Sequence, residues 1–426
     1  MPPAQSKFSS VAKPSLLVIS HVLPFPGNAG QQLRVRYMVE AAASRFDVSF
    51  LTCAPREGKQ EVHERLSSFN CHPIILESRL NGSGLGVFPY RVAAGLFVLR
   101  TGLKSSNYSI GKIELCSTRI RNAVEPRGYY MVLYEYFHAV DSVPLFQAAG
   151  VPTVLDTHNV LWKSLEQHLP RQQFWPKRFR KARLARYRRH EEWAWRRFDA
   201  VIAINRSEHR LIQPSLHPSQ KLFYAPMGTD LSRWPYAWQP ANPPRLAYYG
   251  GLGSPHNEAA ALRCHNHIMP GIWQRFPHAE LWLVGSDPSD RLRTLAADPR
   301  VKVTGFVDRV QDVLSTMSLV LCPWSGTYGF RSRIVEVMAL GVPVVATPEA
   351  VDGMELESGR GLMLADSDQI LVEQALDLLS NPEHLKEESR MARSEMERLY
   401  SLENTYGRLM RELLEWLEHR QVTTDH

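Results

Sequence analysis

Short apolar runs of strand length alternate with stretches of helical periodicity along most of this chain, and this alternation limits the folds open to it. The pattern begins with an apolar run, Ser15 to Ser20, and a proline- and glycine-rich loop, Pro24 to Gly30. Apolar residues at helical spacing follow from Gln31 to Ala43, and a second apolar run covers Asp47 to Thr52. This order predicts a βαβ unit, in which the strands pair in parallel and helices cover the sheet.

The same alternation occurs in two successive series. A segment with four prolines and little periodicity, Ser232 to Pro244, separates them and is interpreted as a linker. With 426 residues the chain is long enough for two domains. We therefore expect an α/β protein with one Rossmann-like, doubly wound domain at 1–235 and another at 245–395. Further strands are expected at 74–76, 130–134, 153–156, 200–204, 221–225, 245–249, 280–285, 301–304, 319–323 and 342–347.

Composition excludes several classes of protein. No apolar run reaches the ~18 residues of a membrane span. The five cysteines are widely spaced and form no CxxC pair, so neither a disulfide framework nor a zinc site is expected, and a reducing cytoplasm fits best.

Doubly wound domains bind ligands at the carboxyl ends of their strands, where helix N-termini attract phosphate. A phosphorylated or nucleotide ligand is the resulting expectation.

One stretch holds the excess positive charge. Arg171 to Arg197 carries a net charge of +9, whereas the whole chain carries +7. Aromatic residues are interleaved with these cations, so the stretch is compatible with an anionic lipid surface, with nucleic acid, or with an ordinary helix whose arginines face solvent. The apolar segment Gly86 to Leu99 is compatible with a lipid contact or with a buried helix. We predict that Trp175, Arg178 and Arg180 contact the acceptor or a membrane.

The segment Ser325 to Thr347 carries the clearest chemical signal. A glycine-containing loop follows an apolar strand, and a helix is predicted to start near Arg331. Arg331 and Arg333 in the first turn add two guanidinium groups to the positive end of the helix, which together suit a diphosphate. Taken alone, such an arginine pair is more often a solvated helix face, but the preceding glycine loop and the following Gly341–Val342–Pro343 favour the phosphate role.

This segment resembles the sugar-nucleotide site of GT-B glycosyltransferases of the retaining family 4, also called group 1. Glu336 matches the second glutamate of the family's E-x7-E motif, which implies contact with the donor ribose. Tyr328 stands where the first glutamate is expected, as in a sub-branch that grips the phosphates with the Arg331 and Arg333 pattern. The loop after the first strand of the second domain, YYGGLGSPHN, is similar to that sub-branch and implies donor contacts at Gly250, Gly251 and Asn257.

The resemblance covers most of the chain. It implies two domains facing across a cleft and a C-terminal helix, 396–426, that packs back towards the N-terminal domain. In SHVLPFPGNAGQQLRVR, Gly30 and Arg34 are implied to face the donor. LDTHN resembles the segment that holds a catalytic-site histidine, here His158, although His158 read alone is a loop histidine and Asp156 a helix cap. In GFV, Phe306 and Val307 are implied to contact the base.

These resemblances imply transfer of a sugar from a nucleotide-diphosphate donor to a hydroxyl acceptor, such as a lipid-linked or cell-envelope glycan. Retention of configuration at the anomeric carbon is implied by the family resemblance alone. No DxD-type cation site is well placed, so neither metal nor cofactor is expected. The protein is expected in the cytoplasm, with an inner-membrane surface as a further partner and nucleic acid not expected as one. The expected catalytic residues are His158, Arg331 and Glu336. The expected donor-binding residues are Gly30, Arg34, Gly250, Gly251, Asn257, Phe306, Val307, Gly326, Thr327, Gly329, Arg331, Arg333 and Glu336.

Two other functions fit parts of the sequence. Loss of the first glutamate at Tyr328 is compatible with a catalytically silent binding or scaffold protein of the same fold. The basic stretch is compatible with a protein that acts on nucleic acid. The sequence leaves open the donor base (uridine or guanosine), the sugar, the acceptor and the oligomeric state.

Overall fold

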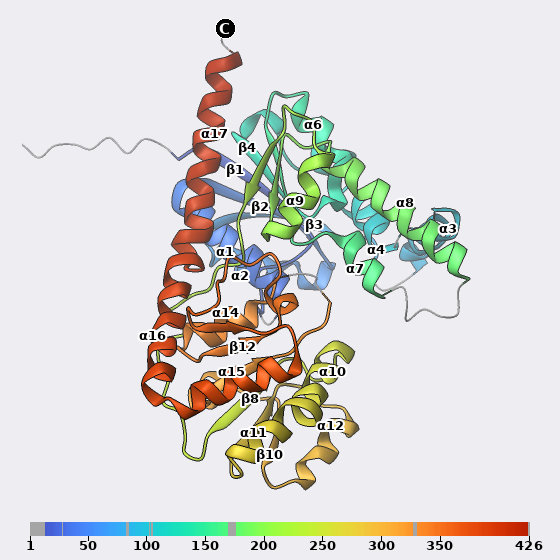
Figure 1. The fold of residues 1–426 in the computed structure, drawn as a ribbon. Helices are drawn as coiled ribbons and strands as arrows, with labels where there is room; N and C mark the ends of the chain where they lie inside the picture. Colours follow the sequence, from blue (N-terminus) through green and yellow to red (C-terminus); the bar gives the residue numbers. More distant parts are fainter. Residues whose placement is uncertain are drawn as a thin grey trace, which may run out of the picture. The chain divides into compact units, whose positions relative to one another are not determined.

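The computed structural model describes residues 13–27, 29–81, 85–101, 103, 105–168, 176–326 and 330–424. The chain forms two compact units. Unit 1 comprises residues 1–203, 211–224 and 406–426, and unit 2 comprises residues 204–210 and 225–405. Figure 1 shows one α/β layered arrangement within each unit. The chain passes from unit 1 to unit 2 twice and returns to unit 1 for its last helix, α17 (Arg408–Thr424).

Unit 1 contains a seven-stranded sheet whose described strands pair in parallel in the order β3-β2-β1-β4-β5-β6-β7. The interior positions of the central strands are mostly apolar because helices cover both faces of a parallel sheet. Leu16, Leu17 and Val18 of β1, for example, are fully buried. The strands are β1 (Ser15–Ser20), β2 (Asp47–Ala54), β3 (Cys71–Glu77), β4 (Met131–Glu135), β5 (Thr153–Asp156), β6 (Ala200–Ala203) and β7 (Lys221–Tyr224).

The helices of unit 1 occupy the crossovers between these parallel strands. The last helix, α17, belongs to the same unit, where Tyr406 before it packs on Tyr37 of α1 with ring centroids 6.0 Å apart. Helix α9 (Arg206–Ile212) spans a boundary between the units. The others are α1 (Gly30–Arg45), α2 (Lys59–Ser67), α3 (Phe88–Thr101), α4 (Ser105–Tyr108), α5 (Ser117–Arg121), α6 (Val143–Gln147), α7 (Leu161–His168) and α8 (Lys177–Trp195).

Unit 2 contains a six-stranded parallel sheet in the order β10-β9-β8-β11-β12-β13. Alternate residues of β8 enter different cores, because successive side chains of a strand point to opposite faces: Leu246 and Tyr248 pack on one side and Ala247 on the other. The strands are β8 (Arg245–Tyr249), β9 (Glu280–Val284), β10 (Val301–Gly305), β11 (Leu319–Cys322), β12 (Val344–Ala346) and β13 (Leu362–Leu364).

The first helical stretch of unit 2 is interrupted: residues 255–275 form two helices joined by a π-helical turn, Cys264–Ile268. Pro270 lacks an N–H and sits in the first turn of the second helix, where that donor is not needed. The helices are α10 (Pro255–Arg263), α11 (Met269–Arg275), α12 (Asp290–Thr294), α13 (Val310–Leu314), α14 (Ser332–Ala339), α15 (Asp368–Ser380) and α16 (Pro382–Leu399).

No helix in the described part of the chain is long and apolar enough to cross a membrane.

Candidate functional site

The strongest site candidate of unit 2 lies where the strand order reverses. Strands β8 and β11 are neighbours in the sheet, although β9 and β10 separate them in sequence. The chain leaves their carboxyl ends in opposite directions, and doubly wound sheets bind ligands at such a point. A cavity of about 200 Å³ is found there, and its lining includes Tyr249 at the end of β8, Trp324 after β11, and Arg331 and Arg333 at the start of α14.

Aromatic rings hold both arginines in the wall of this cavity. The guanidinium carbon of Arg331 lies 3.8 Å from the centroid of the Trp324 ring, and that of Arg333 lies 5.1 Å from the centroid of Tyr249. Stacking occupies the face of a guanidinium group, whereas phosphate oxygens bind its N–H edge. Ring stacking and diphosphate binding are therefore compatible, and stacking limits the conformational entropy that the side chains lose when an anion binds.

The glycine loop after β8 fits closely against Arg333. A Cβ atom on Gly250 would lie 3.3 Å from Nη1 of Arg333 and 3.1 Å from Cγ of Asn257, so a larger residue would displace both side chains. Asn257 fixes the loop from the other side: its Nδ2 donates to the carbonyl of Gly251 at 2.8 Å, and its Oδ1 accepts from the hydroxyl of Tyr248 at 2.8 Å. The structure thus brings Gly250, Gly251, Asn257 and Arg333 together.

Glu336 is one turn further along α14 and is half-buried. The hydroxyl of Tyr249 donates to Oε2 of Glu336 at 3.1 Å. Burial raises the pKa of Glu336 to about 7, although Arg333 and the Tyr249 hydroxyl act in the opposite direction. A carboxylate with this pKa changes charge near neutral pH, and groups perturbed in this way concentrate at functional sites.

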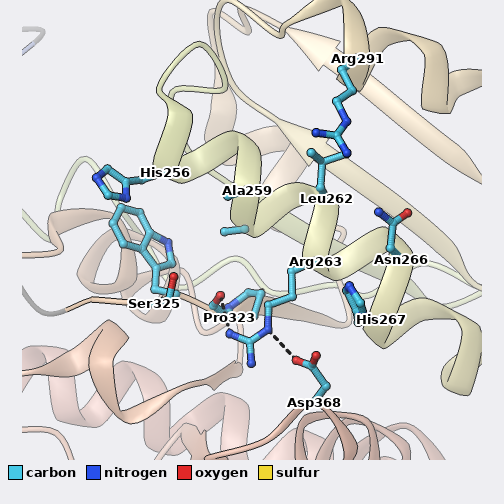
Figure 2. A pocket seen from close by; sticks show the side chains of 12 residues that line it. His256, Ala259, Leu262, Arg263, Asn266, His267, Arg291, Pro323, Ser325 and Asp368 are labelled. Atoms are coloured by element: carbon cyan, nitrogen blue, oxygen red, sulfur yellow. Dashed lines mark hydrogen bonds and ion pairs between the residues drawn. The ribbon is translucent and has the colours of Figure 1, made fainter. Parts of the chain in front are cut away.

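Figure 2 shows the residues that line a second cavity, of about 390 Å³. Trp324 lines both cavities. Arg263 of α10 crosses its floor, where Nε donates to Oδ1 of Asp368 at 2.6 Å and Nη1 donates to the carbonyl of Pro323 at 3.2 Å. His256 stacks on Trp324 with ring centroids 6.3 Å apart. Sequence reasoning missed this cavity. The only signal was that His256 and Trp324 adjoin predicted donor-binding segments.

The remaining predicted residues of unit 2 that the structure describes lie in loops. Phe306 follows β10 and is 76% exposed, and Val307 beside it is half-buried. Gly326 has a φ of +87°, which glycine adopts without strain. Thr327 and Gly329, together with Tyr328 at the position of the missing glutamate, lie outside the described residues.

Unit 1 has its own cluster of charged side chains at the carboxyl ends of β4 and β5. Arg34 of α1 reaches Asp156, the last residue of β5, through two bonds of 2.7 Å, from Nε to Oδ2 and from Nη2 to Oδ1. Both side chains are buried, with exposed fractions of 1% and 0%. A Cβ atom added to Gly30, the first residue of α1, would meet no atom within 4 Å, so packing within the protein does not require glycine there.

His158 lies two residues after Asp156 in a strained backbone conformation. Its φ is +57°, and Tyr136 after β4 also has a positive φ, of +70°. The two rings stack with centroids 4.2 Å apart. Nε2 of His158 binds Glu135, whereas Nδ1 is buried and has no hydrogen-bond partner among the described residues. Strained, non-glycine residues of this kind cluster at functional sites.

Buried charges are balanced within this cluster. Burial and the neighbouring Asp156 raise the pKa of Glu135. Burial also opposes ionisation of Asp156, but Arg34 and His158 outweigh it and lower the pKa of Asp156. Burial, with a further contribution from His158, lowers the pKa of His21 to about 4, so His21 is neutral at pH 7.

Glu135, Asp156 and His158 are close enough to one another to hold a metal ion. However, Arg34 already binds both carboxylate oxygens of Asp156, and His158 binds Glu135. A divalent cation would have to displace the Arg34 guanidinium from a buried ion pair, which is costly. The residues present are therefore better suited to an internal ion network than to a metal site.

The residues predicted for acceptor or membrane contact lie at the start of α8 or beyond the described residues. Arg178 is exposed and Arg180 is half-buried in α8, and Trp175 lies outside the described residues. From Phe88 onward the segment 86–99 belongs to α3, an exposed helix with Leu99 84% exposed, so the alternative of a buried helix is wrong. The buried residues of α8 lie in its C-terminal half, at Tyr187, Glu191, Ala194 and Trp195.

Comparisons with known proteins identify both parts of the chain. Residues 29–228 match the family model of the glycosyl transferase 4-like domain, and residues 243–381 match that of the glycosyl transferases group 1. No curated protein matches the chain at a significant level.

Solved structures share the fold over nearly the whole chain. HepE from Anabaena, in complex with UDP and glucose, is 14% identical and superposes with a TM-score of 0.61 over 94% of this chain and 100% of its own. A sucrose-phosphate synthase from Thermosynechococcus elongatus is 18% identical, with a TM-score of 0.63 over 95% and 100%. TarM is 10% identical, with a TM-score of 0.64 over 96% and 99%. With both domain types matched in order and two parallel-sheet units of this topology, the chain belongs to the group 1 glycosyltransferases of GT-B fold.

Proposed function

We propose that this glycosyltransferase transfers a hexose from a nucleotide-diphosphate sugar to a hydroxyl acceptor, without a metal ion and with retention at the anomeric carbon. One observation carries the proposal: two arginines, each stacked on an aromatic ring, line a cavity beside a glycine pair at the switch point of the unit 2 sheet. This site offers two positive charges and close backbone approach, which a departing diphosphate requires.

In the proposed reaction the bond between the anomeric carbon and the phosphate oxygen breaks, and its electron pair leaves with the diphosphate. The acceptor oxygen forms the new bond to the anomeric carbon, and its proton passes to an oxygen of the departing phosphate. Arg331 and Arg333 stabilise the negative charge that develops there, a task that a metal ion performs in other transferases. Glu336 accepts hydrogen bonds from donor hydroxyls.

Within unit 1 we assign His158 to the positioning of donor or acceptor. Its Nδ1 is buried without a partner among the described residues, so a ligand hydroxyl or phosphate oxygen can satisfy it. Its Nε2 is held by Glu135, which fixes the ring. Arg34, by contrast, donates from Nε and Nη2 to Asp156, and we propose that it supports the segment of His158 rather than binding the donor directly.

Uridine-diphosphate sugars are the first donors to test, because solved structures of HepE contain UDP and UDP-glucose. A cell-envelope or lipid-linked glycan is the proposed acceptor class. WaaB, a lipopolysaccharide outer core galactosyltransferase, has the same fold at 12% identity, and α3 exposes an apolar face. The corresponding location is the cytoplasm, at the inner face of the membrane.

Thermal-shift screening against a panel of UDP- and GDP-sugars tests the proposal. A donor present at ~100 times its Kd stabilises the folded form by about 2.7 kcal/mol, which raises the melting temperature by several degrees. The shift is expected to persist in EDTA and to disappear in the R331A/R333A double variant. If no nucleotide sugar shifts the melting temperature, or if the double variant keeps the shift, the donor site is assigned wrongly.

Glu336→Gln is expected to remove a pH dependence from donor binding. In the wild type the carboxylate is protonated as pH falls through about 7, so donor affinity is expected to decrease from pH 8 to pH 6. The amide of the variant does not titrate. Its affinity is expected to be flat over this range and, at pH 8, about 10- to 100-fold weaker, as for loss of a hydrogen bond to a charged group. Calorimetric titration at pH 6, 7 and 8 measures both effects.

Glu349→Gln is the matched control for this variant, because Glu349 is exposed in the same unit. It is expected to keep the wild-type affinity and pH profile. If the donor affinity of Glu336→Gln keeps the wild-type pH dependence, a group other than Glu336 is responsible for that dependence.

Two alternative functions predict different results in the same preparations. A catalytically silent member of the family would bind a nucleotide sugar but release no nucleotide, even with a range of hydroxyl acceptors. A protein that acts on nucleic acid would bind DNA or RNA with an affinity that falls steeply with salt.

A further inference from the structure

An apolar stripe runs along the exposed side of α3. Phe88, Val92, Leu96 and Leu99 are 65%, 42%, 60% and 84% exposed. At 3.6 residues per turn these four side chains fall within an arc of about 80°. Of the eight large apolar side chains that the described residues leave exposed, four lie on this one face. Such a concentration marks an interaction surface, whereas scattered exposed residues do not.

Cations flank this stripe. Arg91 and Arg100 are exposed and lie on either side of the apolar arc when α3 is viewed along its axis. The opposite side of α3 packs inward, through the buried Ala94 and through Phe97, whose ring stacks on Tyr108 of α4 at 4.1 Å. An apolar face bounded by long cationic side chains is typical of helices that lie in a bilayer interface, because arginines reach the headgroups.

Helix α8 extends the positive charge. Asn107 of α4 donates from Nδ2 to the hydroxyl of Tyr187 in α8 at 2.6 Å, so α3, α4 and α8 form one connected group in unit 1 (Figure 1). The N-terminal half of α8 exposes Lys177, Arg178, Lys181 and the ring of Phe179, which is 48% exposed. Aromatic and cationic side chains together suit an anionic headgroup layer.

We propose that α3 and α8 dock unit 1 on an anionic bilayer, with the apolar stripe of α3 entering the headgroup region and α8 lying on the phosphates. A second copy of the chain fits this surface less well. It would bring the same cluster of positive charge against itself, and four side chains bury far less than the ~1,200 Å² of a stable interface. The proposal concerns the surface alone and does not depend on the identity of donor or acceptor.

Vesicle binding by the full-length protein tests the proposal. The wild type is expected to sediment with vesicles of phosphatidylcholine mixed with phosphatidylglycerol, less with phosphatidylcholine alone, and less as salt rises. Leu96→Ser with Leu99→Ser is expected to lower the partition coefficient at least tenfold, because each substitution removes an apolar side chain that the bilayer would bury. Both positions are exposed, so folding is expected to remain intact.

Arg178→Glu with Lys181→Glu is expected to lower binding to the anionic vesicles at least tenfold and to flatten its salt dependence. Lys386→Glu with Arg390→Glu makes the same change in net charge on α16 of unit 2, where both residues are exposed. This control is expected to bind vesicles as the wild type does.

Three results would overturn the proposal: no binding of the wild type to anionic vesicles, equal losses in the α8 and α16 variants, or a dimer that the α3 variant dissociates. The thermal shift with nucleotide sugars is measured on the same variants and is expected to stay at the wild-type value. A wild-type protein that shows the thermal shift but does not bind anionic vesicles would contradict the docking surface and leave the proposed activity intact.

Discussion

Replacement of Arg333 by alanine is expected to reduce the rate of sugar transfer by a factor of about 10² to 10³, as for loss of one preorganised donor to a developing negative charge. Arg333 lies against the Gly250–Gly251 backbone and over Tyr249, so its position is fixed before any ligand arrives. Arg331→Ala is expected to have a similar effect. Because the two guanidinium groups serve one diphosphate, the double variant is expected to lose less than the product of the single losses. Nucleotide release from the donor identified by thermal shift measures all three rates.

Arg309→Ala serves as the control for these variants. Arg309 is an exposed arginine of the same unit, 3.1 Å from Asp312, and is expected to leave the rate unchanged. Arg333→Lys tests charge and geometry separately, because a lysine keeps the positive charge but lacks the planar guanidinium group. Its rate is expected to lie between those of Arg333→Ala and the wild type. Rates within a few-fold of wild type in the double variant, with intact folding, would contradict the proposed role of both arginines.

Replacement of Arg34 by methionine is expected to destabilise unit 1 by about 3 to 5 kcal/mol at pH 7, because Asp156 is left as a buried carboxylate without its partner. The loss is expected to shrink at lower pH. Arg34 and His158 hold the pKa of Asp156 below its ordinary value against burial, so the wild-type pair stabilises the fold above pH ~4. In the variant the pKa of Asp156 rises above that value, so the penalty grows as pH increases towards 7.

Chemical denaturation of the full chain at pH 5 and pH 7, followed by circular dichroism, measures this dependence. Arg36→Met is the matched control on the same helix. Arg36 is half-buried and pairs with Glu40 at i+4, an arrangement that contributes less than ~1 kcal/mol. Equal losses for the two variants, or a loss in Arg34→Met that does not change with pH, would show that the buried pair does not act as described.

Much of the fold follows from local sequence pattern. Strands β1, β5 and β8 occupy the residues that their apolar runs predict, and α14 begins one residue after Arg331 and ends before Gly341. Gly341 has a φ of +85°, which is why a glycine ends the helix there. Strand β13, Leu362–Leu364, was not predicted.

The candidate site was predictable where its residues are close in sequence. Arg333 and Glu336 are three residues apart on α14, a spacing that places them on one face of the helix, and Arg331 is the N-cap residue of the same helix. The partners of these residues come from other strands: Tyr249 from the end of β8 and Trp324 from the end of β11. A sequence contains no signal for such a pair until the strand order is known.

Local pattern was thus sufficient for the parallel sheets, which apolar runs alternating with helices specify. A glycine loop followed by an arginine-rich helix start indicated the segment that lines the cavity for which we propose anion binding. The tertiary structure decided which charges meet. Arg34 was predicted to face the donor, yet it is paired with Asp156, 122 residues away. A buried guanidinium must be neutralised by the nearest carboxylate in space, and only the packing of α1 against the end of β5 determines which carboxylate that is.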